Sequence, residues 1–122
     1  MVLGVIKSMP FMFENLDVYK KSLAFVVGIF DICVEIRDRE VKDQLKRAAL
    51  SVPLNIAEGN GRNTDKEKCQ FYKVARGSLF ECVPLLEVCL KTRVMSEAKH
   101  KELYELANDV GMMINGLIRS LK

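Results

Sequence analysis

Four basic side chains near the centre of the chain are the residues best suited to chemistry, and the chemistry they suggest is phosphate binding. The four are Arg62, Lys66, Lys73 and Arg76. Lys66 and Lys73 are seven residues apart, which places them two turns apart on one side of a helix. Residues 42–76 hold eight basic and four acidic side chains, so the charge excess of the protein lies in this segment. A basic patch attracts polyanions, although a solvated helix face is the commoner meaning of a few lysines.

The sequence contains no comparable pattern of residues for catalysis or metal binding. His100 is the only histidine, and it lies between two lysines with no nucleophile or carboxylate suggesting a triad. The sequence Gly-Asn-Gly-Arg at 59–62 lacks the Gly-Lys-Ser/Thr ending of a phosphate loop. The cysteines, which form no C-x-x-C pair and are spaced too widely for zinc, are Cys33, Cys69, Cys82 and Cys89. We therefore expect a protein that is not an enzyme and holds no metal or cofactor.

The elements that position the basic residues are predicted to be four helices. Apolar residues recur every three or four positions in four segments, and no segment alternates as a strand would. These segments are 14–37, 41–58, 64–92 and 96–122. Four helices with short connections predict an all-α fold, an antiparallel up-down-up-down four-helix bundle. Residues 1–12 have no such period and include Pro10, so we expect an N-terminal tail before a bundle domain at 13–122.

Composition agrees with a single compact domain. The chain has 122 residues, of which 49% are hydrophobic and 29% charged. The longest apolar run, Leu23 to Phe30, is well short of the roughly 20 residues that a membrane span needs. The first residues lack the pattern of a signal peptide, so we expect a cytoplasmic protein with reduced cysteines and no membrane partner.

The first helix is apolar on two sides, which predicts contact between subunits. Its main stripe, expected to face the core, consists of Tyr19, Leu23, Val26, Val27, Phe30, Cys33 and Val34. A second stripe consists of Val18, Phe25, Ile29, Ile32 and Ile36. Because a helix that is apolar on most sides is buried on most sides, we assign the second stripe to a subunit interface. Leu50 and Leu54, on the outer face of the second helix, are assigned to the same interface.

The turn between the second and third helices combines glycines with polar residues. Gly59 and Gly61 are expected to supply the positive φ of a helix end. Asn55, Glu58 and Arg62 permit two interpretations. They could form an anion or RNA site, or a hydrogen-bonded network that fixes the turn and a subunit contact.

A second glycine feature lies inside the third helix. Gly77 and Ser78 interrupt it where glycine costs roughly 1 kcal/mol relative to alanine. We expect the reason to be close approach to the small residues Ala48 and Ala49 of the second helix.

The centre of the chain resembles a known family. The stretch SVPLNIAEGNGR at 51–62, preceded by QLKRAA at 44–49 and followed by ARGSLFE at 75–81, resembles the four-helix bundle proteins related to the 23S rRNA intervening-sequence protein. The resemblance runs from about Phe13 to the C-terminus. The motif residues that it carries over, with a structural role, are Arg47, Asn55, Glu58, Gly59, Gly61, Gly77, Ser78 and Glu81. The elbow at 37–40 is shorter than in most of the family, and Pro84 inside the third helix is atypical.

The resemblance implies a homo-oligomer, with a ring-like pentamer as the first expectation. The family includes proteins encoded within insertions in bacterial large-subunit rRNA genes. It is also distantly similar to accessory proteins of diversity-generating retroelements, which associate with a reverse transcriptase and its RNA. An RNA-binding or ribonucleoprotein accessory is thus one expected function. A purely structural oligomerisation module without nucleic acid is the alternative.

Overall fold

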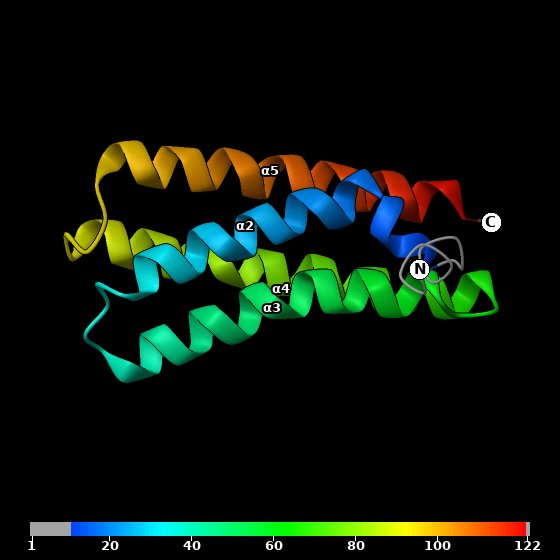
Figure 1. Ribbon diagram of the computed structural model, residues 1–122, viewed down its shortest axis with the longest axis horizontal. Coiled ribbons are helices and arrows are strands. Elements are labelled where there is room, and N and C mark those ends of the chain that lie inside the picture. The colour runs from blue at the N-terminus through cyan, green and yellow to red at the C-terminus, as the bar shows by residue number, and fades with distance from the viewer. Residues whose placement is uncertain (1–10, 122) are drawn as a thin grey trace, which may run out of the picture.

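The computed structural model describes residues 11–121, and it is a bundle of four long helices. The elements are a 3₁₀ turn η1 (Met12–Asn15) and the helices α2 (Asp17–Cys33), α3 (Arg39–Asn60), α4 (Asp65–Lys91) and α5 (Glu97–Ser120). Figure 1 shows the chain reversing direction at each connection, with the α3–α4 turn at one end and the other two connections at the opposite end. The predicted all-α, antiparallel four-helix bundle is confirmed. Most of the expected tail, residues 1–10, lies outside the described residues.

Side-chain caps fix where three of the helices begin. The side chains of Thr64 and Ser96 each accept a hydrogen bond from the backbone N–H three residues later, as expected of N-cap residues. Asp38 does the same at the elbow, where its Oδ1 accepts from the N–H of Val41 at 2.9 Å. This cap explains why α3 begins at Arg39, two residues before the predicted start.

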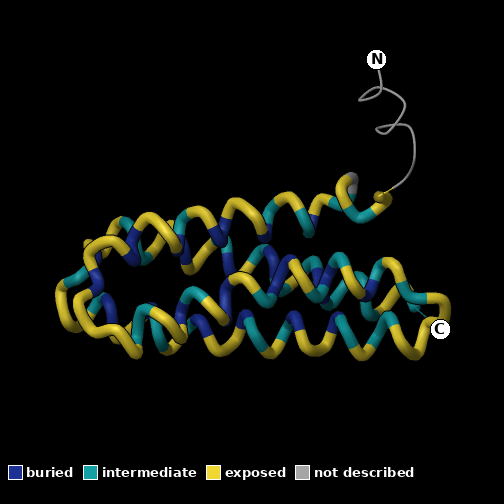
Figure 2. The backbone as a smooth tube through the Cα atoms, turned by 60° about the horizontal axis from the view of Figure 1, so that its bottom comes forward, coloured by how far each residue is buried: buried dark blue, intermediate teal, exposed yellow. Residues whose placement is uncertain are grey.

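The core lies along the axis of the bundle, as the buried inner edges of the helices show in Figure 2. Each helix packs on two neighbours, in the order α2, α3, α4, α5 and back to α2. On α3 the residues at helical spacing face the core, and all are buried except Val41, which is half-buried: Val41, Leu45, Ala48, Ala49, Val52 and Ile56. On α4 the structure buries Tyr72 at 2% exposure and leaves Phe71 half-buried.

The two apolar stripes of the first helix are largely, although not completely, exchanged relative to the prediction. The stripe that we assigned to a subunit interface is buried inside the monomer, and its members Val18, Phe25, Ile29, Ile32 and Ile36 are at most 6% exposed. In the stripe assigned to the core, Val26 and Cys33 are buried as predicted, whereas most of the others are exposed, with Val34 at 78% and Val27 at 61%. The physical reason is that α3 and α5 pack on the side of α2 that carries Phe25 and Ile29.

An exposed apolar surface does exist, on the other side of α2 from the predicted one and including Leu50 and Leu54 of α3 as predicted. We call it the α2–α3 apolar face, and it consists of Leu23, Val27, Phe30, Val34, Leu50 and Leu54. The two helices meet at this face where Lys46 Nζ lies over the Phe30 ring, 5.0 Å from its centre. Leu50 is 40% exposed and Leu54 is 64% exposed, so their predicted outward positions are confirmed. The subunit contact itself stays a prediction.

The glycines act by close approach and not by positive φ. Gly61 has φ −84°, and no glycine in residues 11–121 has positive φ, so that part of the prediction is wrong. A Cβ on Gly59 would lie 2.8 Å from Tyr72 Cε1 and 2.9 Å from Phe71 Cβ, so glycine is required where α4 folds back on α3. Gly77 is exposed and a Cβ there meets nothing within 4 Å, which contradicts the expected contact with α3.

The elbow and Pro84 are both accommodated without breaking the bundle. Ile36, 4% exposed, anchors the short elbow between α2 and α3 in the core. Pro84 lies inside α4 and lacks the N–H that would bond the carbonyl of Phe80. Because Pro84 is exposed, water can reach that carbonyl and replace the missing donor.

Candidate nucleic-acid interface

The outward face of α4 carries the two best-placed basic side chains. Thr64 starts the helix, and Lys66 and Lys73 follow with an exposed glutamine, Gln70, between them. The seven-residue spacing separates the two lysines by about 10.5 Å along the helix axis. Neither lysine forms an ion pair or hydrogen bond with the rest of the described chain. Their charges are therefore available to an external anion.

Arg76 faces the neighbouring helix α5 and is only half-buried. Its Nη1 donates a hydrogen bond of 2.8 Å to Oδ1 of Asn115. A guanidinium has five donors in a fixed plane, so one side of the group remains available after this contact. Arg76 is thus a cation held in position at the α4–α5 junction.

Arg62 is already paired, and it lies on another side of α4. Its Nη2 contacts Glu58 Oε2 at 2.6 Å, and its guanidinium stacks over Phe71 with 4.6 Å to the ring centre. Phe71 is about 140° around α4 from Lys66, counting 100° per residue. The Nε of Arg62 is buried without a hydrogen-bond partner among the described residues. The structure therefore does not bring Arg62 together with Lys66 and Lys73.

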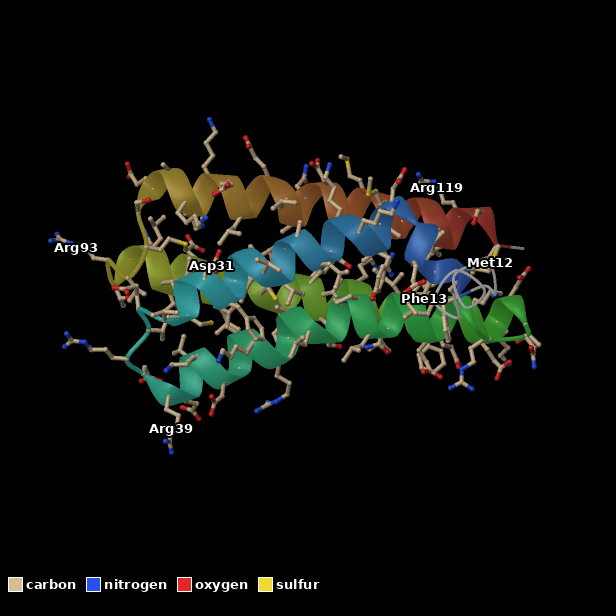
Figure 3. All side chains as sticks on the ribbon, in the orientation of Figure 1. Met12, Phe13, Asp31, Arg39, Arg93 and Arg119 are labelled. Carbon is tan, nitrogen blue, oxygen red and sulfur yellow. The ribbon has the colours of Figure 1, made fainter. Side chains whose placement is uncertain are left out.

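Arg119 is a basic residue that sequence reasoning missed. Ile118 and Leu121 of the C-terminal end of the chain line a surface depression together with Lys66 and Lys73. Arg119 is adjacent to Ile118 and exposed, and Figure 3 shows it at the end of the bundle that also holds Met12. The predicted antiparallel packing of the last two helices could have indicated it, because it places the end of α5 beside the start of α4 (Figure 1). Asp65 lies in the same depression and reduces the local positive charge.

The polar motif residues form two separate local groups. Ser51 Oγ and Ser78 Oγ are 2.7 Å apart and join α3 to α4, and Asn55 Nδ2 donates to Ser51 Oγ at 2.9 Å. Glu58 and Arg62 form the other group at the helix end. The structure thus does not join Asn55 to Glu58 and Arg62 in one network, because Asn55 bonds to Ser51 while Glu58 pairs with Arg62. An anion site and a subunit contact at this turn both stay predictions. Ser78 is one polar link between the two helices.

Two further motif residues, Arg47 and Glu81, are exposed. Within residues 11–121 neither forms an ion pair or hydrogen bond. The fold of the single chain therefore gives no reason for their charges, which point outward from α3 and α4.

The cysteines behave as small apolar residues. Burial raises the pKa of the Cys82 thiol from 9.0 to about 12, and burial also raises the pKa values of Cys33 and Cys89. A raised pKa keeps each thiol protonated and unreactive near neutral pH. In the described part of the chain, no cluster of three or more His, Cys, Asp or Glu side chains is arranged to hold a metal ion. No helix there is long and apolar enough to cross a membrane.

Known proteins share both the sequence pattern and the fold. The family profile described as "23S rRNA-intervening sequence protein" matches residues 14–116. A crystal structure of a protein of unknown function from the S23 ribosomal protein family of Bacteroides thetaiotaomicron superposes with a TM-score of 0.76. The two are 18% identical, and the alignment covers 83% of this chain and 97% of that one, so this likeness concerns the fold. Among curated proteins, none matches the sequence significantly. The match over residues 14–116 places the chain in the family of 23S rRNA-intervening sequence proteins.

Proposed function

We propose that the protein is a non-enzymatic, homo-oligomeric accessory that binds RNA through its phosphates. The observation that carries this proposal is the pair of exposed lysines on α4, Lys66 and Lys73, neither of which forms an ion pair with an acidic side chain of residues 11–121. Arg76 extends the same basic region onto the α4–α5 junction, and Arg119 is a further exposed cation on α5 at the same end of the bundle (Figure 3). The family name, which refers to a segment interrupting 23S rRNA, agrees with an RNA partner.

The oligomer is proposed to form through the α2–α3 apolar face. Isolated apolar side chains are normal on protein surfaces, but contiguous ones mark interaction sites. Six large apolar residues on two adjacent helices are exposed here by 37–78%. A ring repeats the basic region once per subunit, so a modest charge in one chain becomes a continuous positive surface. A pentamer, which the family resemblance implies, would carry five copies.

A structural module without nucleic acid is the second candidate, because the α2–α3 apolar face alone would support it. The two are separated by measuring the affinity of a fluorescent RNA at several salt concentrations. If phosphates are bound, log K falls linearly with log salt, because condensed counterions are released. The Lys66→Glu/Lys73→Glu double variant is expected to bind more weakly and to lose about one unit of slope per lysine.

The matched control is the double variant Arg39→Glu/Arg93→Glu. It makes the same change of charge at exposed positions at the opposite end of the bundle (Figure 3). We expect this control to retain most of the affinity, and both variants to keep the native oligomer mass. If RNA does not bind at low salt, the structural-module function is correct. If the lysine variant binds RNA as well as the control does, Lys66 and Lys73 are not the phosphate site.

A further inference from the structure

The surface between α4 and α5 contains a small groove directly beyond the basic region. Its floor is apolar, with Leu79 from α4 and Ala107 from α5, and two asparagines, Asn108 and Asn115, lie along α5. The groove has a volume of about 270 Å³, just below the roughly 300 Å³ at which pockets for small ligands begin. It is therefore suited to one small planar group. A Cβ on Gly111 would lie 3.4 Å from Leu79 Cδ2 and would narrow this space.

Two exposed aromatic rings stand at the groove, one from each helix. Phe80 of α4 is 61% exposed and Tyr104 of α5 is 50% exposed. Tyr104 is held by stacking on His100, with ring centres 6.1 Å apart and an interplanar angle of 23°. Phe80 makes no ring contact within residues 11–121. Exposed aromatic faces of this kind are stacking platforms for bases in single-stranded nucleic acids, because every base has a π-face.

The groove also offers hydrogen-bonding groups on its apolar floor. Asn115 Oδ1 accepts the bond from Arg76, which fixes the orientation of the amide. The Nδ2 of Asn115 makes no hydrogen bond with a described residue, so it remains a donor for a carbonyl oxygen or ring nitrogen. Asn108, exposed at the same groove, can donate and accept. Apolar stacking surfaces with a few amides are what an unpaired base requires.

The basic side chains of α4 lie in line with this groove. Phe80 lies seven residues after Lys73, which itself lies seven after Lys66, so the three share one line along α4. Arg76 is fixed at the entrance through Asn115. A nucleic-acid strand following the lysines through its phosphates thus reaches the aromatic pair. The groove is short, and basic side chains lie beside it. These two features favour a polyanion over an apolar helix of a partner protein.

We propose that the groove bounded by Phe80 and Tyr104 seats one unpaired base of a single-stranded or looped RNA. This inference rests on the proposed function, because the phosphate contacts bring the strand to the groove. Duplex RNA keeps its bases stacked, so it can contact the lysines but cannot fill the groove. The protein would then prefer unpaired RNA to a duplex of equal length. Sequence preference would be weak, since stacking tolerates every base.

The test compares a 12-nucleotide oligoadenylate, an abasic oligonucleotide of the same length and a duplex RNA. Phe80→Ala and Tyr104→Ala are each expected to lower the affinity for oligoadenylate about tenfold, which lies within the range for loss of one stacking contact. The affinity for the abasic strand and the duplex is expected to stay the same. Tyr104→Phe keeps the ring and is expected to retain binding. Val74→Ala, an exposed apolar residue about 120° away around α4, is the control without effect.

A second readout separates stacking from charge. The chain has no tryptophan and three tyrosines, so stacking on Tyr104 is expected to quench tyrosine fluorescence. Phe80→Ala is expected to leave the salt slope unchanged, whereas Lys66→Glu/Lys73→Glu lowers it. Equal affinity for abasic and normal strands would overturn the base site while leaving phosphate binding intact. A change of oligomer mass in Phe80→Ala or Tyr104→Ala would overturn it in favour of a protein interface. No binding of any RNA would overturn both proposals.

Discussion

Arg76 and Asn115 join α4 to α5 through one hydrogen bond of 2.8 Å, and this bond also fixes the cation nearest to the groove. An arginine that holds two helices together is less free to follow an RNA strand than the lysines beside it. Its structural and binding roles can be separated by changing each partner in turn.

Asn115→Ala is expected to lower the free energy of unfolding by about 1–2 kcal/mol, because a half-buried bond to a charged group is lost. Arg76→Ala is expected to cost about as much and also to weaken RNA binding. The coupling energy from the double variant measures the bond itself. Denaturant unfolding and RNA titration supply the data. Additive effects on stability would show that the bond contributes nothing.

Gly59 and Gly77 are expected to respond to alanine in opposite directions. Gly59→Ala places a methyl group within 3 Å of Tyr72 and Phe71, so we expect a loss of stability of about 1–3 kcal/mol from overpacking. Gly77→Ala meets open space in an exposed helix, so we expect a gain of up to about 1 kcal/mol. Thermal unfolding of the two variants checks this pair. If Gly77→Ala instead lowers the oligomer mass, a neighbouring subunit approaches α4 at that position.

The buried thiols predict that stability falls at high pH. An unfolded Cys82 loses its proton near its ordinary pKa of 9.0, whereas the folded residue keeps it until a pKa of about 12. Between these values the unfolded state binds fewer protons, so the free energy of unfolding decreases as pH rises. At pH 10.5 the loss from this one group is about 2 kcal/mol.

Denaturant unfolding at pH 8 and pH 10.5, in the presence of a reductant, measures this loss. The variant Cys82→Ala is expected to be less stable than the unchanged protein at pH 8, because it leaves a cavity. Its pH dependence is nevertheless expected to be smaller than that of the unchanged protein. Equal pH dependence in the two proteins would contradict the assignment to Cys82.

The α2–α3 apolar face predicts which substitutions dissociate the oligomer. Val27→Glu combined with Leu54→Glu alters two residues that are 61% and 64% exposed, so we expect monomers that keep their helical circular dichroism. Phe25→Glu and Ile29→Glu change residues that are fully buried, and these variants are expected to unfold. Light scattering and circular dichroism distinguish the outcomes. A monomeric unchanged protein at micromolar concentration would remove the basis for this face.

The sequence predicted the helices and most of their ends, because helical periodicity and capping residues are local signals. It could not decide which side of α2 faces inward, since both sides carry enough large apolar residues to form a core. The position of Gly28 was an unused signal. A Cβ there would lie 2.6 Å from Leu103 Cδ2, so the side of α2 that carries this glycine is the one that α5 approaches closely. The side of α2 nearest to it includes Phe25 and Ile29, which are buried.

The candidate site was predicted only in part, because the spacing of residues within one helix is a local signal and the packing between helices is not. Lys66 and Lys73 share a side of one helix, and that relationship depends only on their spacing. The pairing of Arg62 with Glu58 was foreseeable from their spacing of four residues, but its stacking on Phe71 was not. Arg119 and the groove at Tyr104 required knowledge of how α4 and α5 pack, which no single segment contains.

The hairpin of α3 and α4 is held by the Ser51–Ser78 contact and by the close approach at Gly59. We expect it to fold before the rest of the bundle. Its contacts are the most extensive in the bundle and join residues near in sequence, whereas α2 meets α5 only across most of the chain. Loops between near residues close at little entropic cost, so we expect this hairpin to form the nucleus. Substitutions at Ser51 would then slow refolding, and those at Gly28 would mainly speed unfolding. The element that carries the basic residues would thus be the first to acquire its shape.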